Sequence, residues 1–340
     1  MTRVWALALV AVTASAQAPR IGEINFYGLR KVPAEKILTT LQLKSGDTLP
    51  PSKGDMEDAI EKIPGVVMAR VQAVCCEGRS VALFIGVEER GAPLFAVHSP
   101  PAGNAELPED LVDTYHKFLS AVEEAARRGA TAEDLSSGQP LMIDPKARAY
   151  QQQFVAYATA HLDLLRSAIH EAAEPDVRAV AVAVIGYAPK KAGVINDLQY
   201  AMQDPDEAVR SNAMRALESI AAASARQSKA DVPISATWFV EMLNSISLSD
   251  RQRAAEALVT LTDHGNREAL EQIRERALPA VVEMARWKTL RYALPAFLLV
   301  GRMAGLPEKQ IQEQWSKGAR EAVIQKVMAQ NQAGRGDSIK

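Results

Sequence analysis

One helical pattern recurs in the second half of the chain. Arg210 is followed by apolar residues 3, 6, 7 and 10 positions later, and the same offsets from Arg178 and Arg251 again meet apolar residues. These offsets put the apolar residues on one face of an α-helix. The three arginines are separated by 32 and 41 residues, a spacing typical of repeats built from helix pairs. Since one such pair cannot bury its apolar face alone, the pattern predicts a stack of pairs, an α-solenoid.

The best-preserved copy of this repeat reads Asp204-Pro205-Asp206 followed by Val209-Arg210, and a second copy reads Pro175-Asp176-Val177-Arg178. Asp204 or Asp206 can cap the helix N-terminus. The arrangement is similar to the bacterial HEAT-like repeats of the family named after phycobilin lyases. The resemblance implies a protein-binding scaffold, because most such repeats bind proteins; the chain offers no bilin-attaching feature. The repeated arginines are expected to pair with neighbouring aspartates.

Residues 20–91 follow a different pattern. Ile24 and Phe26 alternate with polar residues as in a strand, and two stretches with helical spacing follow. Two further alternating runs, 66–74 and 80–88, flank a turn. The unit is therefore a small α/β domain with the order β-α-α-β-β.

This unit resembles a POTRA domain, the periplasmic module of outer-membrane assembly and division proteins. The resemblance rests on the run Ile24-x-Phe26-x-Gly28-Leu29-Arg30-Lys31-Val32, on Gly46-Asp47, and on the closing Val87-Glu88-Glu89-Arg90. It implies an envelope protein that binds other proteins.

The predicted order of strands leaves the second strand at an edge. A right-handed crossover places the third strand beside the first, so the second strand has unpaired backbone groups on its outer side. Its face away from the helices carries Met68, Arg70, Gln72 and Val74. We expect these residues to bind a partner segment that adds to the sheet as a further strand. In the alternative interpretation, Arg70 and Gln72 only keep the edge soluble.

Residues 1–16 have the features of a signal peptide. Thr2-Arg3 gives a positive start, residues 4–12 are apolar, and Ala14-Ser15-Ala16 is a small-residue cleavage site. The prediction is an exported, periplasmic protein whose mature chain begins at Gln17; an uncleaved anchor is the alternative.

The remaining segments complete a multidomain, mainly α architecture. Proline and glycine mark residues 92–105 as a linker, and two long helices within 106–174 are expected to cap the repeats. The HEAT-like solenoid is expected to occupy residues 175–330, and residues 331–340 form a flexible tail.

No catalytic, metal-binding or cofactor-binding residues are predicted. The five histidines are dispersed, and His161 is interpreted as a structural residue on the apolar face of a helix spanning 145–173. Cys75 is expected to be buried and reduced, with a disulfide to the adjacent Cys76 as the alternative. The net charge of −2 provides no field that would favour nucleic acid.

These observations predict a protein-binding scaffold of the cell envelope without enzymatic activity. The alternative is an envelope enzyme or ligand-binding protein with a site between the capping helices and the loop at 129–144. A deep pocket with converging titratable side chains would favour the alternative, whereas a shallow concave face would favour the scaffold.

Overall fold

The computed structural model describes residues 18–77, 80–92, 95–226, 234–263 and 265–337. The N-terminal domain contains, in chain order, β1 (Arg20–Tyr27), α1 (Ala34–Leu41), α2 (Lys53–Glu61), β2 (Val66–Glu77) and β3 (Ser80–Glu89). Its three-stranded sheet has the order β1-β3-β2, with β1 parallel and β2 antiparallel to β3. The predicted sheet order is confirmed. The Ser52 hydroxyl caps α2, since it accepts a hydrogen bond from Asp55 N.

The two faces of this sheet contribute to different cores. Leu83 and Ile85 of β3 point toward α1 and α2 and pack with Ile37 and Ile60 in the domain's own core. Phe84, which lies between them in sequence, points to the opposite face and belongs to the core of the helical array. The alternation of a single strand thus supplies two separate cores.

The other elements are nearly all helices. In chain order they are α3 (Glu109–Arg127), β4 (Glu133–Asp134), β5 (Leu141–Met142), α4 (Pro145–Ala160), α5 (Leu162–Glu171), α6 (Pro175–Ile185), η1 (Lys191–Gly193), α7 (Ile195–Ala201), α8 (Glu207–Arg226), α9 (Thr237–Met242), α10 (Leu248–Thr262), α11 (Arg267–Arg276), α12 (Leu278–Ala285), α13 (Leu290–Met303), α14 (Glu308–Ser316) and α15 (Arg320–Asp337). They stack into an α-solenoid, as the periodicity predicted.

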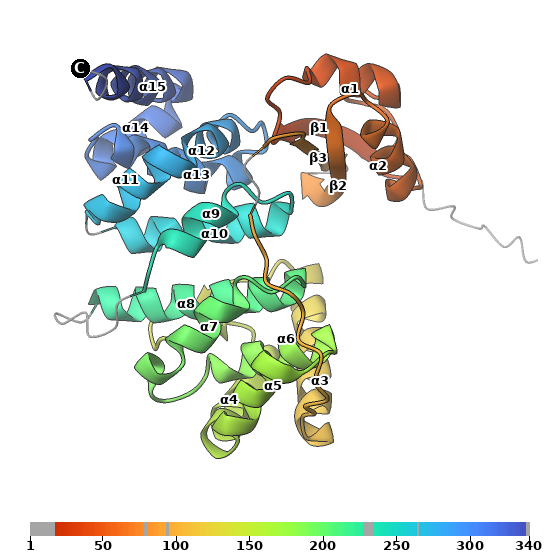
Figure 1. Ribbon diagram of the computed structural model, residues 1–340, viewed down its shortest axis with the longest axis vertical. Coiled ribbons are helices and arrows are strands. Elements are labelled where there is room, and N and C mark those ends of the chain that lie inside the picture. The colour runs from red at the N-terminus through yellow and green to blue at the C-terminus, as the bar shows by residue number, and fades with distance from the viewer. Residues whose placement is uncertain (1–17, 78–79, 93–94, 227–233, 264, 338–340) are drawn as a thin grey trace, which may run out of the picture.

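The chain runs along the solenoid and then returns (Figure 1). From the N-terminal domain an extended segment passes beside α9 and α8 to α3, at the far end of the stack. The helices then wind back, so that α12 and α13 come to lie beside the N-terminal domain. The domain therefore packs against the last repeats, although the segment that follows it leads to the first.

Three local predictions need correction or refinement. The expected long helix at 145–173 is two helices, because the chain breaks at His161, whose φ and ψ are −125° and 29°. The helix expected at 267–287 divides before Pro279, as predicted for a proline inside a helix. Helix α15 continues to Asp337, so most of the expected flexible tail is helical. Residues 338–340 lie outside the described residues.

Candidate functional site

The repeated arginines form a ladder of buried ion pairs that links successive repeats. Arg178 donates to both carboxylate oxygens of Asp204, at 2.7 and 2.9 Å, and to the carbonyls of Ala172 and Ala173. Arg178 is 2% and Asp204 1% exposed. The hydrogen bond to Asp204 raises the pKa of Arg178, although burial opposes the shift. The first rung is a bidentate pair closed to solvent.

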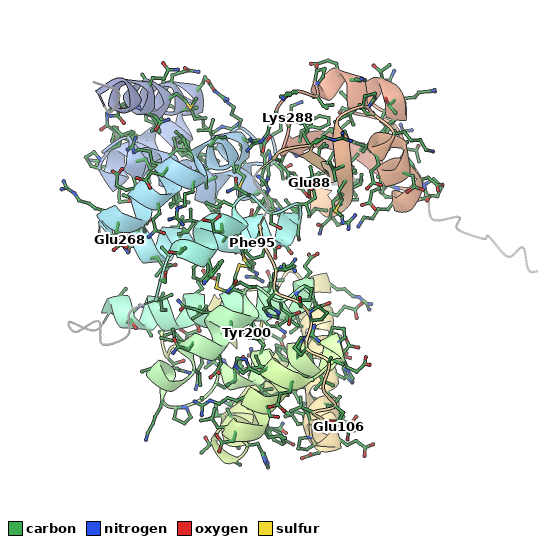
Figure 2. The ribbon with its side chains drawn as sticks, viewed as in Figure 1. Glu88, Phe95, Glu106, Tyr200, Glu268 and Lys288 are labelled. Atoms are coloured by element: carbon green, nitrogen blue, oxygen red, sulfur yellow. The ribbon has the colours of Figure 1, made fainter. Side chains whose placement is uncertain are left out.

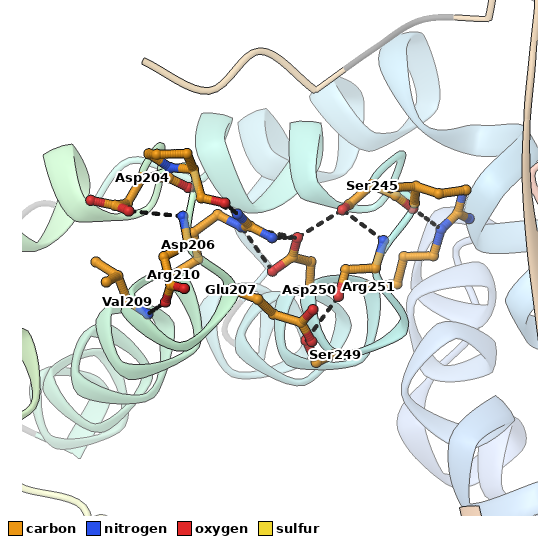
Figure 3. A network of polar contacts seen from close by, with 12 residues as sticks. Asp204, Asp206, Glu207, Val209, Arg210, Ser245, Ser249, Asp250 and Arg251 are labelled. Atoms are coloured by element: carbon orange, nitrogen blue, oxygen red, sulfur yellow. Dashed lines mark hydrogen bonds and ion pairs between the residues drawn. The ribbon is translucent and has the colours of Figure 1, made fainter. Parts of the chain in front are cut away.

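The second rung repeats this geometry one helix pair later (Figure 3). Arg210 Nε lies 3.1 and 3.0 Å from the two oxygens of Asp250, and Nη1 donates to the carbonyls of Asp204 and Pro205. Ser245 also donates to Asp250, at 2.7 Å. Asp206, and not Asp204, caps α8, by accepting from the backbone N–H groups of residues 208 and 209.

The third rung differs because the N-terminal domain takes part in it. Arg251 lies over the ring of Tyr27 at 4.8 Å and only 3.5 Å from Glu283 Oε2. Burial lowers the pKa of Arg251 and raises that of Glu283, while the charge of each opposes the shift of the other. Glu283 also accepts a hydrogen bond of 2.8 Å from Gly28 N. The last rung thus joins the ladder to strand β1 and the residue after it.

Further contacts fix the same junction. Asn25 donates to Thr289 Oγ1 at 2.9 Å and accepts from Lys288 N at 2.7 Å. Trp287 Nε1 donates to the carbonyl of Phe26 at 2.9 Å, and its ring packs edge-on against Phe84 with centroids 5.1 Å apart. Asn25 and Thr289 are buried. Because these polar groups satisfy each other, removing one of them would leave its buried partner without a hydrogen bond.

A cleft of about 860 Å³ opens beside this junction. We call it the interdomain cleft. One wall is the chain from Ile24 to Lys31, and the other comes from α12, Trp287 and Lys288, with Met328 and Asn331 of α15 at one end. Figure 2 shows Lys288 where the two walls meet. The volume of the interdomain cleft is within the range usual for ligand sites.

The loop from Gly28 to Val32, which carries Arg30 and Lys31 into this cleft, is rigidly held. The carboxylate of Glu89, 4% exposed, accepts hydrogen bonds from the backbone N–H groups of Arg30, Lys31 and Val32, at 2.7 to 3.0 Å. Burial alone would raise the pKa of Glu89. These hydrogen bonds and the charge of Arg30 outweigh burial, so the pKa is lowered. The side chains on the loop are therefore presented from a fixed backbone.

The four residues predicted to bind a partner face the protein's own repeats. Met68 and Arg70 line a second cleft, of about 420 Å³, together with residues of α8 and the loop before α10. Gln72 lines a third, of about 480 Å³, with α10 and α13. Val74 packs at the margin of the solenoid core. The sheet face that carries them is thus an inner wall of the molecule.

The outer edge of β2 is also less open than expected. Its outward N–H groups at Ala69 and Val71 donate to the carboxylates of Glu61 and Glu57 on α2, at 2.9 and 2.7 Å. A partner strand pairing along this half of β2 would have to displace both carboxylates. The two acidic residues on α2, four positions apart, were the available sequence signal for this protection.

The segment expected to be a linker is attached to the solenoid along its course. Backbone hydrogen bonds join His98 to Gln203, and Gly103 to Glu171 and Ala173. The ring of His98 stacks on Tyr200, with centroids 4.3 Å apart. Figure 2 places Phe95 and Tyr200 along this path. A side chain at Gly103 would lie 2.6 Å from the Glu171 carbonyl, so the close approach requires glycine.

The alternative site between the capping helices and the loop at 129–144 is filled by structural contacts. Gln151, 0% exposed, accepts from Met142 N and donates to Pro140 O and the Tyr187 hydroxyl. Arg215 Nε donates to Glu133 at 2.8 Å. Burial raises the pKa of Tyr187 to about 12, so this hydroxyl stays protonated at neutral pH. These groups hold the short β4–β5 hairpin onto the repeats.

Other candidate residues are dispersed or exposed. His161 is exposed at the break between α4 and α5, so its placement on an apolar helix face was wrong. Cys75 is exposed and disulfide-bonded, so the expectation of a buried, reduced Cys75 was also wrong. Burial, with a contribution from Glu256, raises the pKa of Glu218 to about 7. Among the described residues, no group of three or more His, Cys, Asp or Glu could hold a metal ion.

A comparison with models of protein families agrees with the repeat architecture. Residues 162–259 match the family model described as HEAT repeats. Among solved structures, the designed armadillo repeat protein YIII(Dq)4CqI is similar over 57% of this chain and 98% of its own, with 17% identity and a TM-score of 0.36. A comparison with curated proteins returned no significant match. Residues 162–259 thus match HEAT repeats, a fold that typically forms protein-interaction scaffolds.

Within the described ranges, no helix combines the length and the apolar character needed to cross a membrane. The predicted signal peptide at 1–16 lies outside those ranges.

Proposed function

We propose that this protein is an exported scaffold of the cell envelope that holds a protein partner in the interdomain cleft. The observation that carries the proposal is the composite origin of the cleft: residues 24–31 form one wall and α12 with residues 287–288 the other. Neither the N-terminal domain nor the repeats could form it alone. A HEAT array supplies an extended rigid surface, and the fused domain turns its last repeats into a defined site.

The charged groups at the junction, Arg251 and Glu283, are engaged in structural contacts. This favours a binding role for the cleft over a catalytic one. Arg251 and Glu283 lie against each other, and Glu283 also holds Gly28 N. The HEAT fold is generally a non-enzymatic scaffold, and the match at 162–259 indicates no catalytic family. The wall residues Met68 and Arg70 extend the proposed surface into the second cleft.

Export is the part of the proposal that rests on sequence. The POTRA-like pattern at 20–91 and the signal-like pattern at 1–16 both favour the periplasm. Sequencing the N-terminus of the protein purified from its native cells should give Gln17. An intact Met1 in the envelope fraction would overturn this part without affecting the cleft.

The binding role can be tested by site-specific photo-crosslinking in living cells. A photoreactive amino acid replaces Lys288 or Met328 in the cleft, and Lys309 on α14 serves as the exposed control. The expected result is one discrete protein adduct at the two cleft positions that is absent at the control. No adduct at the cleft, or equal adducts at all three positions, would contradict the proposal.

A further inference from the structure

Three cations at the interdomain cleft form no ion pair within the described part of the chain. Arg30 and Lys31 project from the loop held by Glu89, and Lys288 lies on the opposite wall. All three are exposed. The other cations of the lining are already engaged, since Arg251 lies near Glu283, and Arg286 pairs with Glu321 at 2.7 Å. The rim is therefore positive, although the charge of Arg30 also acts on the carboxylates of Glu89 and Glu283.

The surface between these cations is apolar. Phe26 and Leu29 come from the N-terminal side, and Leu278 and Met328 from the repeats. Phe26, Leu29 and Met328 are only partly buried, so each keeps apolar surface in contact with water. Covering that surface is favourable, because it removes apolar area from water.

Among the described residues that line the cleft, Glu283 is the only one with a carboxylate, and it faces the junction. Its Oε2 accepts from Gly28 N and lies near Arg251. An acidic ligand would therefore meet three cations and one carboxylate that is already neutralised. A basic ligand would be repelled by the same three cations and would find no free carboxylate to pair with among the described lining residues.

We propose that the interdomain cleft binds an extended acidic peptide segment of the partner, with an apolar side chain seated on the floor between Leu29 and Met328. Carboxylates of the segment pair with Arg30, Lys31 and Lys288 at the rim. This inference rests on the proposed function, because it specifies the partner chemistry at the same site. The mixed surface favours a peptide over a nucleic acid, since nucleic acids need larger, more strongly basic surfaces.

The test uses fluorescence anisotropy with the full mature chain. The probe is a fluorescein-labelled seven-residue peptide in which glutamate alternates with leucine; a lysine-for-glutamate version and a serine-for-leucine version are the comparison probes. The cleft variant is Lys31→Gln/Lys288→Gln. Its matched control is Lys36→Gln/Lys309→Gln, which removes two exposed lysines from the same two regions but leaves the cleft unchanged.

We expect the acidic apolar probe to bind the wild type and the control within twofold of each other. Binding to the cleft variant should weaken about fivefold to tenfold, because two exposed charge pairs of modest strength are lost together. The difference should shrink at high salt. The serine and lysine versions should bind more weakly than the probe.

Each contrary result has a defined meaning. Equal binding of the probe to the cleft variant and the control would overturn the inference, as would preference for the lysine version. If the adduct forms in cells at Lys288 but the probe does not compete with it, the partner chemistry is wrong and the scaffold function stands. If no adduct forms at the cleft, the proposed function itself fails.

Discussion

Arg210 and Arg251 occupy the same position in successive repeats, yet their surroundings differ. Arg210 is paired with both oxygens of Asp250, and its hydrogen-bond partners all belong to the repeats. Arg251 lies 3.5 Å from Glu283 and stacks on Tyr27, which belongs to another domain. The pairs of Arg178 and Arg210 thus connect successive repeats, whereas Arg251 and Glu283 connect the repeats to the N-terminal domain. One repeat position can therefore serve either the fold or the assembly of a site.

The largest expected effect comes from breaking an inner rung. Arg210→Met leaves Asp250, which is 0% exposed, without its cation. The free energy of unfolding should fall by about 3–5 kcal/mol, the usual consequence of an uncompensated buried charge. Urea unfolding followed by circular dichroism measures the loss. Arg210→Met/Asp250→Leu should recover most of it; a loss below about 1 kcal/mol in the single variant would mean that the rung is not structural.

Breaking the last rung should lower the free energy of unfolding by less, and should loosen the junction with the N-terminal domain instead of the stack of repeats. Arg251→Met removes the cation over Tyr27 and the donor to Ser245 O, but Glu283 keeps its hydrogen bond from Gly28 N. We expect a loss of about 2–3 kcal/mol. Hydrogen exchange should accelerate at the junction, at residues 25–31, more than in α6 to α8. Exchange that accelerates equally throughout the array would remove the distinction between the rungs.

The smallest expected effect concerns Glu89 and depends on pH. The pKa of Glu89 is lowered in the folded protein. Its carboxylate therefore adds to the free energy of unfolding at neutral pH, and this contribution is lost as the pH falls through the folded pKa. Glu89→Gln should cost about 1–2 kcal/mol at pH 7 and progressively less below about pH 4, since a glutamine does not titrate. Thermal unfolding across this pH range measures it. Parallel curves for the two proteins would contradict the role assigned to Glu89.

The sequence predicted the elements much better than the way they meet. The spacing after Arg178, Arg210 and Arg251 was enough to predict the repeats, because helix periodicity is a local property. The partner of Arg251, Tyr27, lies in another domain, and no local pattern connects the two. The alternation in the sequence puts Met68 and Arg70 on one face of the sheet, but it could not show that repeats lie across the second cleft from them.

The attached segment at 92–105 shows the same limit. Proline and glycine suggested a linker, because those residues are frequent in chain without regular structure. Gly103 instead permits close backbone contact with Glu171, and His98 stacks on Tyr200. Glycine occurs both in flexible connections and where two backbones lie close together. Only the position of the neighbouring helix shows which of the two applies at Gly103.

We expect the N-terminal domain and the last repeats to form one rigid body around the interdomain cleft, because Glu283 and Trp287 hydrogen-bond directly to the backbone of Gly28 and Phe26. The distance between spin labels on encoded amino acids at Lys36 and Lys309, measured by pulsed electron paramagnetic resonance, tests it most directly. We expect a single narrow distribution of distances for the wild type, and a broader one for Arg251→Met. A broad or two-peaked distribution for the wild type would contradict it.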